Sequence, residues 1–369
     1  MKIETFELER VQSLWENLVE INLTESGIHP YTLEELLDPE EITELTRLRL
    51  GYGQTNGSIE FRQAIAALYD GADINNVLVT NGSAEANFIA SWNLLEPGDE
   101  LVMMLPNYMQ LWGIARSFGN DVRPFHLRLE QRWVPDLDEL RAAVSARTKM
   151  IAVCNPNNPT GAVLDPEAMR EIVQVAAEID AWLYADEVYR GTELDGNEAP
   201  SFYGMYDKAV VTGGLSKAYA LPGLRIGWLV GPEQMIADSW SYHDYTSIAA
   251  SPLSNRVGAR ALSPELRPRI LQRSRSQLHD NLSVMQGWLA EQGDGFGFVP
   301  PQAAGMAFVS YPMGINSTEL VTRLRQEKGV LVIAGDCFGM DGHLRFGIGG
   351  EREVLIEGLG RVGELLQEL

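Results

Sequence analysis

The sequence predicts an α/β protein with a mostly parallel sheet between helices and a smaller α+β domain beside it. Between residues 77 and 212, short apolar runs alternate with amphipathic stretches of helical period. Such alternation is typical of strand–helix units whose strands pair in parallel, with helices on both faces of the sheet. After residue 264 one long helical pattern is followed by strands and helices in mixed order, which predicts the second domain.

The first part of the chain, residues 1 to about 41, predicts an acidic amphipathic helix and then a short second helix. Between them, residues 22–30 form a polar connection that contains Gly27 and Pro30. Thr32 is the expected N-cap of the short helix, because its hydroxyl can accept from a free N–H of the first turn.

From Gly57 onward, capping and turn residues delimit each element. Ser58 is the expected N-cap of a helix over 59–69, and Pro97-Gly98 ends a helix over 83–95. Pro166 suits the first turn of a helix that reaches residue 179. A further helix starts at Met109, and the expected strands are 77–80, 100–105, 122–127, 149–154, 182–185 and 209–212.

The C-terminal part predicts a helix from Pro264 towards Glu291, a helix capped by Ser317 and a last helix from Arg352. Its expected strands are 307–311, 330–334 and 343–348. We therefore place the large, cofactor-binding domain at residues 42–272. The small domain is expected to combine residues 1–41 with 273–369.

Composition narrows the class of protein. The chain has 369 residues, 45% of them hydrophobic, and a net charge of −22, which disfavours binding to nucleic acid or to anionic membranes. No apolar run approaches the roughly 20 residues of a membrane span, and no secretory signal is visible at the start, so we expect a cytoplasmic protein. Cys154 and Cys337 are interpreted as reduced thiols, in preference to a disulfide or metal ligands.

A lysine lies among small and apolar residues directly after the expected strand 209–212. Poor solvation in the run 213–217 should disfavour the ammonium of Lys217 and make its free amine available to an aldehyde. Arg225, eight residues later, offers a planar cation for a phosphate. A lysine that can react with an aldehyde and an arginine that can bind a phosphate together indicate a pocket for pyridoxal 5′-phosphate. A Walker-type phosphate loop is excluded because its pattern is absent, and a surface lysine after a strand is the ordinary alternative.

Other candidate residues follow the expected strands, at the edge where parallel sheets bind ligands. Asp186 could pair with a protonated pyridine nitrogen, and Tyr189 could hold the phenolate oxygen of the ring. The backbone of Gly82-Ser83-Ala84 could hold an anion at a helix start. Asn158 presents an amide donor, and Tyr108 could stack on a flat ring. Helix capping, packing and a turn are the ordinary alternatives for these positions.

Taken in order, these runs resemble the class I and II aminotransferases of pyridoxal-phosphate fold type I, the superfamily of aspartate aminotransferase. The resemblance spans nearly the whole chain. It implies a seven-stranded, mostly parallel sheet sandwiched by helices and a small α+β domain. The matching runs are Tyr52-Gly53-Gln54-Thr55-Asn56-Gly57, Gly82-Ser83-Ala84, residues 155–161, Asp186-Glu187-Val188-Tyr189, Ser216-Lys217, residues 222–227 and Arg345.

The resemblance implies a role for each matching residue. Lys217 would form the Schiff base with pyridoxal phosphate and shuttle protons, Asp186 would pair with the pyridinium, and Tyr108 would stack on the ring. Asn158 and Tyr189 would bind the ring oxygen, and Arg345 would clamp the substrate carboxylate together with Asn158 and Gly27. Tyr52 would reach the phosphate of the other subunit. The remaining phosphate ligands would be Gly82, Ser83, Ala84, Ser216 and Arg225, and no metal is expected.

The activity implied is a ping-pong exchange of an amino group between an L-amino acid and a 2-oxo acid, in a homodimer with shared active sites. Gly214 departs from the family pattern, because many relatives carry a serine there. The partner-subunit arginine that selects dicarboxylates in aspartate aminotransferase has no counterpart. Residues 25–30 and 243–246 resemble the subgroup that includes capreomycidine synthase, so a lyase or cyclase is an alternative. A non-catalytic regulatory module is a remote one, since no helix-turn-helix or basic extension accompanies the fold.

Overall fold

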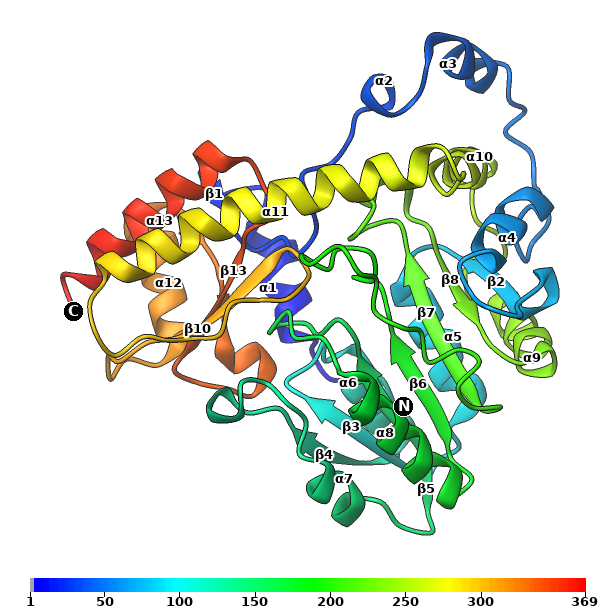
Figure 1. Ribbon diagram of the computed structural model, residues 1–369, viewed down its shortest axis with the longest axis horizontal. Helices are drawn as coiled ribbons and strands as arrows, with labels where there is room; N and C mark the ends of the chain where they lie inside the picture. The colour runs from blue at the N-terminus through cyan, green and yellow to red at the C-terminus, as the bar shows by residue number, and fades with distance from the viewer. Residues whose placement is uncertain (1–2) are drawn as a thin grey trace.

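A computed structural model of the chain describes residues 3–369. Its centre is a seven-stranded sheet in the order β2-β8-β7-β6-β5-β3-β4 (Figure 1). Only β8 is antiparallel to its neighbours, β2 and β7. The predicted α/β fold with a mostly parallel sheet is therefore confirmed. The strands are β2 (Val77–Thr80), β3 (Glu100–Leu105), β4 (Asp121–His126), β5 (Thr148–Cys154), β6 (Trp182–Asp186), β7 (Ala209–Gly214) and β8 (Gly227–Val230).

Helices cover both faces of this sheet, because neighbouring residues of each strand point to opposite sides. Val77 and Val79 face one core and Leu78 faces the other. The first core includes α4 (Ile59–Ala66), α7 (Leu137–Ala143), α8 (Pro166–Glu178) and α10 (Pro252–Ala261). The second core is closed by α5 (Ser83–Leu94), α6 (Gln110–Phe118) and α9 (Glu233–His243).

The small domain contains two further sheets. β1 (Ile21–Asn22) pairs in parallel with β11 (Val330–Leu331), so the N-terminal segment joins the C-terminal part of the chain. The other sheet has the order β12-β13-β10-β9. Its strands are β9 (Gly297–Phe298), β10 (Met306–Ser310), β12 (Ile333–Ala334) and β13 (His343–Gly347), and its companion helices are α12 (Ser317–Lys328) and α13 (Arg352–Leu366).

One long helix, α11 (Leu266–Glu291), runs across both parts of the molecule (yellow in Figure 1). Leu271 packs in the core of the large sheet, whereas Leu278 packs in the core of the small domain. The predicted boundary at residue 272 falls between these two residues, and the domain limits stay a prediction. Residues 1–2, with which the predicted small domain begins, lie outside the described residues.

The N-terminal segment follows the outside of the molecule before it enters the large domain. After α1 (Glu7–Trp15) and β1, the short helix α2 (Leu33–Leu36) begins at the predicted Thr32 cap. α3 (Pro39–Thr46) stands at the edge of the molecule above α10 (Figure 1), where Glu44 pairs with Arg256 at 3.1 Å. Residues 47–57 then lead to α4.

Several expectations need correction. The N-cap of α12 is Asn316, whose side chain accepts from the N–H groups of Thr318 and Glu319, and not Ser317. Ser317 is buried, and its own N–H donates to Asp341, so it belongs to the first turn. The expected strand 330–334 is divided at Val332 between two sheets, and the helix expected over 59–69 ends at Ala66. The sequence reading also missed α3, α7, α9, α10 and β8.

None of the helices within residues 3–369 is both long and apolar enough to cross a membrane. In the same part of the chain, no three histidine, cysteine, aspartate or glutamate side chains gather to hold a metal ion.

Candidate active site

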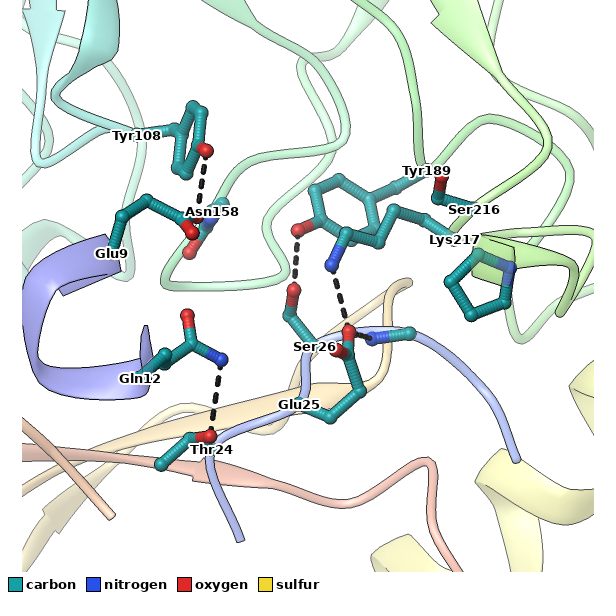
Figure 2. Close-up of polar contacts among 12 residues, drawn as sticks. Glu9, Gln12, Thr24, Glu25, Ser26, Tyr108, Asn158, Tyr189, Ser216 and Lys217 are labelled. Carbon is teal, nitrogen blue, oxygen red and sulfur yellow. Dashed lines mark hydrogen bonds and ion pairs between the residues drawn. The ribbon is translucent and has the colours of Figure 1, made fainter. Parts of the chain in front are cut away.

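The candidate residues meet where the carboxyl ends of β5, β6 and β7 face the small domain. Asn158 follows β5, Asp186 ends β6, and Lys217 follows β7. Arg345 comes from β13 on the opposite side and donates to Asn158. Figure 2 shows Tyr189 and Lys217 pointing towards residues 24–26 of the N-terminal segment. The structure therefore brings together side chains that lie far apart in the sequence.

Lys217 forms an ion pair that the sequence did not predict. Its Nζ donates to Oε1 of Glu25 at 2.7 Å, and the lysine side chain is 28% exposed (Figure 2). Burial lowers the pKa of Lys217, but the charge and hydrogen bond of Glu25 act against burial, and the net pKa is raised. The expectation that desolvation favours the free amine is therefore wrong for the chain without cofactor, because a carboxylate compensates the ammonium.

Glu25 is held in place by its own segment. The N–H of Gly27 donates to the same Oε1 at 2.7 Å. Burial alone would raise the pKa of Glu25, whose side chain is still half exposed, but Lys217 and this N–H bring the pKa down to about 2. Nothing in the periodicity of the sequence singled out Glu25. The only signal was the likeness of residues 25–30 to one subgroup of enzymes.

Glycines on the small domain make room for residues 25–27. A Cβ on Gly347 of β13 would collide with the carbonyl oxygen of Glu25, and one on Gly349 would collide with that of Gly27. A Cβ on Gly305 would lie 2.6 Å from the carbonyl oxygen of Gly27. Because side chains are absent at these three positions, the backbone of residues 25–27 passes close to β13 and presents Glu25 and Ser26 to Lys217 and Tyr189.

Asp186 is a buried carboxyl group with little compensation. Its Oδ1 accepts from the N–H of Val188 at 3.1 Å, and the residue is 7% exposed. Burial raises its pKa to about 6, although Val188 and the charge of Lys217 act in the opposite direction. A cation beside this carboxyl group would reverse the effect of burial.

Tyr189 and Tyr108 border the same space from two sides. The hydroxyl of Tyr189 donates to Oγ of Ser26 at 2.9 Å, and burial raises its pKa to about 12. The hydroxyl of Tyr108 donates to Oε1 of Glu9 at 2.7 Å (Figure 2). Burial and the charge of Glu9 raise the pKa of Tyr108 well above its usual value. Glu9, which lies on α1, was also missed by the sequence reading.

Arg345 is a buried cation that protein groups only partly satisfy. The residue is 1% exposed; Nη1 donates to Oδ1 of Asn158 at 2.9 Å, and Nη2 donates to the carbonyl of Thr24 at 2.6 Å. Its Nε has no partner within the described residues. The ordinary alternative for this residue is a salt bridge to Asp341 or to a carboxylate at the domain interface. Within the described residues Arg345 forms no such ion pair, and Asp341 accepts from the N–H of Ser317 at 2.7 Å. A buried guanidinium with an unpaired N–H is stabilised when an anion binds beside it.

The carbonyl oxygen of Asn158 faces Arg345, so its amide NH₂ group is left to donate in another direction. This fits the predicted double use of Asn158, once towards a ring oxygen and once towards a substrate carboxylate. Both uses stay predictions.

An anion cradle forms where the start of α5 meets Arg225. Ser83 and Ala84 occupy the first turn of α5, whose N–H groups have no acceptor within the helix. Nη1 of Arg225 lies 3.4 Å from Oγ of Ser216. Gly82 has a φ of 83°, and a Cβ there would lie 2.6 Å from Nη2 of Arg225. One cation, one hydroxyl group and a helix N-terminus thus converge, as a phosphate requires.

The departure at Gly214 lies where the backbone is closely packed. A Cβ on Gly214 would lie 3.3 Å from the carbonyl oxygen of Ile226, which is tighter than ordinary contact. A Cβ on Gly227 would lie 2.5 Å from the backbone nitrogen of Ser83. Strands β7 and β8 and the start of α5 are therefore closely packed here, and a serine at position 214 would require a small shift of the neighbouring backbone.

Tyr52 is not brought to this cluster. Its side chain is 89% exposed and lies on the segment between α3 and α4. The predicted contact with the phosphate of another subunit stays a prediction.

The residues present fit pyridoxal phosphate. Lys217 would hold its aldehyde, the cradle its phosphate, and Asp186 its ring nitrogen. Two observations support the fit: the close approach of Gly82 to Arg225, which a Cβ would block, and the buried, little-compensated carboxyl group of Asp186.

Comparisons with known proteins agree with this site. The family model described as aminotransferase class I and II matches residues 21–362. Capreomycidine synthase from Streptomyces vinaceus is 34% identical over 352 residues, which cover 94% of this chain and 89% of that protein. A PLP-dependent aminotransferase from Streptococcus suis superposes with a TM-score of 0.94 at 35% identity, over 100% of this chain and 99% of that one. The PLP-dependent cyclase OrfR gives a TM-score of 0.90 at 27% identity, over 100% and 98% of the two chains.

Proposed function

The chain belongs to the class I and II aminotransferases, pyridoxal-phosphate enzymes of fold type I, and from this premise we propose that it exchanges an amino group between an L-amino acid and a 2-oxo acid. The observation that carries the proposal is the convergence of Lys217, Asp186 and the anion cradle beside the buried Arg345, whose Nε has no partner among residues 3–369. Each pyridoxal-phosphate group has a matching residue, and Arg345 is left for the substrate.

Bound pyridoxal phosphate supplies an aldehyde that takes up an amino group and a ring that withdraws electrons. The protein positions the reactants around it. Arg345 and Asn158 orient the amino acid through its α-carboxylate. The N–H of Gly27, predicted as a further donor, is directed to Oε1 of Glu25 at 2.7 Å. Nζ of Lys217 would take the proton from the α-carbon of the substrate and deliver it to the carbon that takes over the amino group. Asp186 keeps a negative charge at the ring nitrogen, and Tyr189 donates to the ring oxygen.

The reaction has two halves that use the same residues in opposite directions. The first amino acid leaves as a 2-oxo acid before the second 2-oxo acid binds, so the kinetics are ping-pong. Both substrates carry a carboxylate next to the reacting carbon, and therefore Arg345 serves each of them.

We also propose a homodimer with shared active sites in the cytoplasm. Leu50, Tyr52 and Tyr245 are 81%, 89% and 82% exposed, and such apolar groups favour burial against a second copy. Tyr52 would then complete the phosphate cradle of the partner. The cytoplasmic location is supported by Cys154 and Cys337, which are both unpaired in the described chain.

The test is a half-reaction followed by residue labelling. Loaded enzyme is mixed with single amino acids without a 2-oxo acid, and the cofactor absorbance and the released 2-oxo acid are measured. We expect one equivalent of 2-oxo acid per site and full turnover once 2-oxoglutarate is added. Borohydride should attach the cofactor to the peptide of Lys217, and Lys217→Ala should lose turnover. A protein that stays unlabelled with pyridoxal phosphate would refute the proposal.

A lyase or cyclase is the second candidate. It is favoured by the 34% identity to capreomycidine synthase and by the superposition on the cyclase OrfR. Such an enzyme needs no 2-oxo acid and releases ammonia, water or a cyclic amino acid over many turnovers. Mass spectrometry of the products without any 2-oxo acid therefore separates the two functions.

A further inference from the structure

The contact between Glu25 and Lys217 has a consequence for the chemistry of the lysine. We propose that Glu25 is the counter-ion of Lys217: the carboxylate of Glu25 raises the proton affinity of the lysine nitrogen, both in the uncombined side chain and in the Schiff base with the cofactor aldehyde. The inference rests on the proposed function, in which Lys217 carries the cofactor. Glu25 acts through Lys217 and not on the substrate, so it is a positioning residue.

The geometry places a fixed charge beside the nitrogen. Oε1 of Glu25 lies 2.7 Å from Nζ of Lys217, and the same oxygen accepts from the N–H of Gly27 at 2.7 Å. Gly305, Gly347 and Gly349 seat the backbone of residues 25–27 against the small domain, and the N–H of Gly27 anchors the carboxylate of Glu25, whose side chain is 50% exposed. It therefore stays near the nitrogen when Lys217 condenses with the aldehyde and water leaves.

Other charges also face Lys217, and their effects differ in sign. Asp186 at the end of β6 and Glu16 after α1 favour the protonated nitrogen, as does Tyr189 when ionised. Arg345 on β13 disfavours it. Among these groups Glu25 alone donates or accepts a hydrogen bond with Nζ within the described residues. Removing the charge of Glu25 should therefore lower the pKa of the Lys217 nitrogen more than removing the charge of Asp186, Glu16 or Tyr189.

Glutamine is the matched substitution at this position. In Glu25→Gln the amide oxygen can still accept from the N–H of Gly27, so the shape of the segment is kept while the charge is lost. Glu25→Asp keeps the charge and shortens the reach. Glu34→Gln is the control, because Glu34 is an exposed residue on α2, away from Lys217.

The experiment is a pH titration of the absorbance of the loaded enzyme, without substrate. The protonated and unprotonated forms of the lysine–cofactor nitrogen absorb at different wavelengths, so the midpoint reports the proton directly. We expect the midpoint of Glu25→Gln to lie about one to two pH units below that of the wild type. The midpoint of Glu25→Asp should lie between these two values, and the midpoint of Glu34→Gln should equal that of the wild type.

A second measurement uses the empty protein. Only the unprotonated amine of Lys217 adds to the aldehyde, so Glu25→Gln should take up pyridoxal phosphate about tenfold faster at neutral pH. Borohydride labelling identifies the lysine that has reacted. Labelling of Lys217 with an unmoved midpoint in Glu25→Gln would overturn this inference alone. Labelling of another lysine would overturn the proposed function as well.

Discussion

Replacing Asp186 by asparagine should stabilise the empty protein and impair the loaded enzyme. The carboxyl group is 7% exposed and has one hydrogen bond, from the N–H of Val188. The amide oxygen of asparagine can accept that bond, and the volume hardly changes. The substitution therefore removes one thing only, which is the ability to carry a negative charge in a buried place.

The magnitude follows from the pKa. Burial raises the pKa of Asp186 from 3.8 to about 6. Each pKa unit corresponds to about 1.36 kcal/mol, so the ionised carboxylate costs the folded, empty protein about 3 kcal/mol. Because the folded state holds the proton more tightly than the unfolded state, wild-type stability should fall as the pH rises from about 4 to 6. Above pH 6 the full cost is present.

The assay is urea unfolding of the cofactor-free proteins between pH 4 and pH 8. The free energy of unfolding of Asp186→Asn should exceed that of the wild type by about 3 kcal/mol at pH 8, and most of this excess should vanish at pH 4. Burial raises the pKa of Glu187 to about 7. Because Glu187 is present in both proteins, its contribution to the difference in unfolding free energy largely cancels. Asp207→Asn, at an exposed position just before β7, is the control and should show no such dependence on pH.

The loaded enzyme should respond in the opposite way. Without the carboxylate the ring nitrogen is no longer held protonated, and we expect a loss in kcat/KM of roughly 100-fold or more, about 2.7 kcal/mol. If Asp186→Asn were no more stable than the wild type at pH 8, the argument from burial would be wrong. If it kept near wild-type activity, Asp186 would not be the partner of the ring.

Two further substitutions test the substrate clamp and the phosphate cradle. Arg345→Lys keeps the charge but not the planar fork, so KM for the amino acid and for the 2-oxo acid should rise together, about tenfold or more, with cofactor retention unchanged; loss of cofactor at constant KM would make Arg345 structural. Gly82→Ala places a Cβ 2.6 Å from Nη2 of Arg225 at a φ of 83° and should weaken pyridoxal-phosphate binding about tenfold or more in an equilibrium titration. Gly98→Ala, with a φ of 95° and open space around its Cβ, controls for backbone strain alone, and equal weakening in both variants would refute the steric argument.

The order and kind of most elements followed from the sequence because their causes act within a few residues. Short apolar runs between amphipathic stretches marked β2 to β7, and Thr32 and Ser58 cap the helices as expected. Short elements without a strong local signal were missed, such as α7 and the four residues of β8. At α12 two adjacent capping residues competed, and the buried surroundings of Ser317 left the cap to Asn316.

The candidate site could be found from the sequence to the extent that its residues follow strand ends. Asp186 and Lys217 follow neighbouring parallel strands, β6 and β7, so the topology alone places them at one edge. The family resemblance added Arg345 and the phosphate ligands. The contacts that these side chains make in the folded protein could not be predicted from the sequence.

Only the tertiary structure decided the electrostatic partners. Lys217 meets Glu25 across 192 residues, Tyr108 meets Glu9 across 99, and Arg345 meets Asn158 across 187. Periodicity and capping report interactions within about one turn of helix or between adjacent strand positions. They carry no information on which distant carboxylate lies against the partly buried amine of Lys217. Desolvation of Lys217 was foreseen, yet the sign of its pKa change depends on a hydrogen-bonded charge 2.7 Å away, which only the folded chain places there.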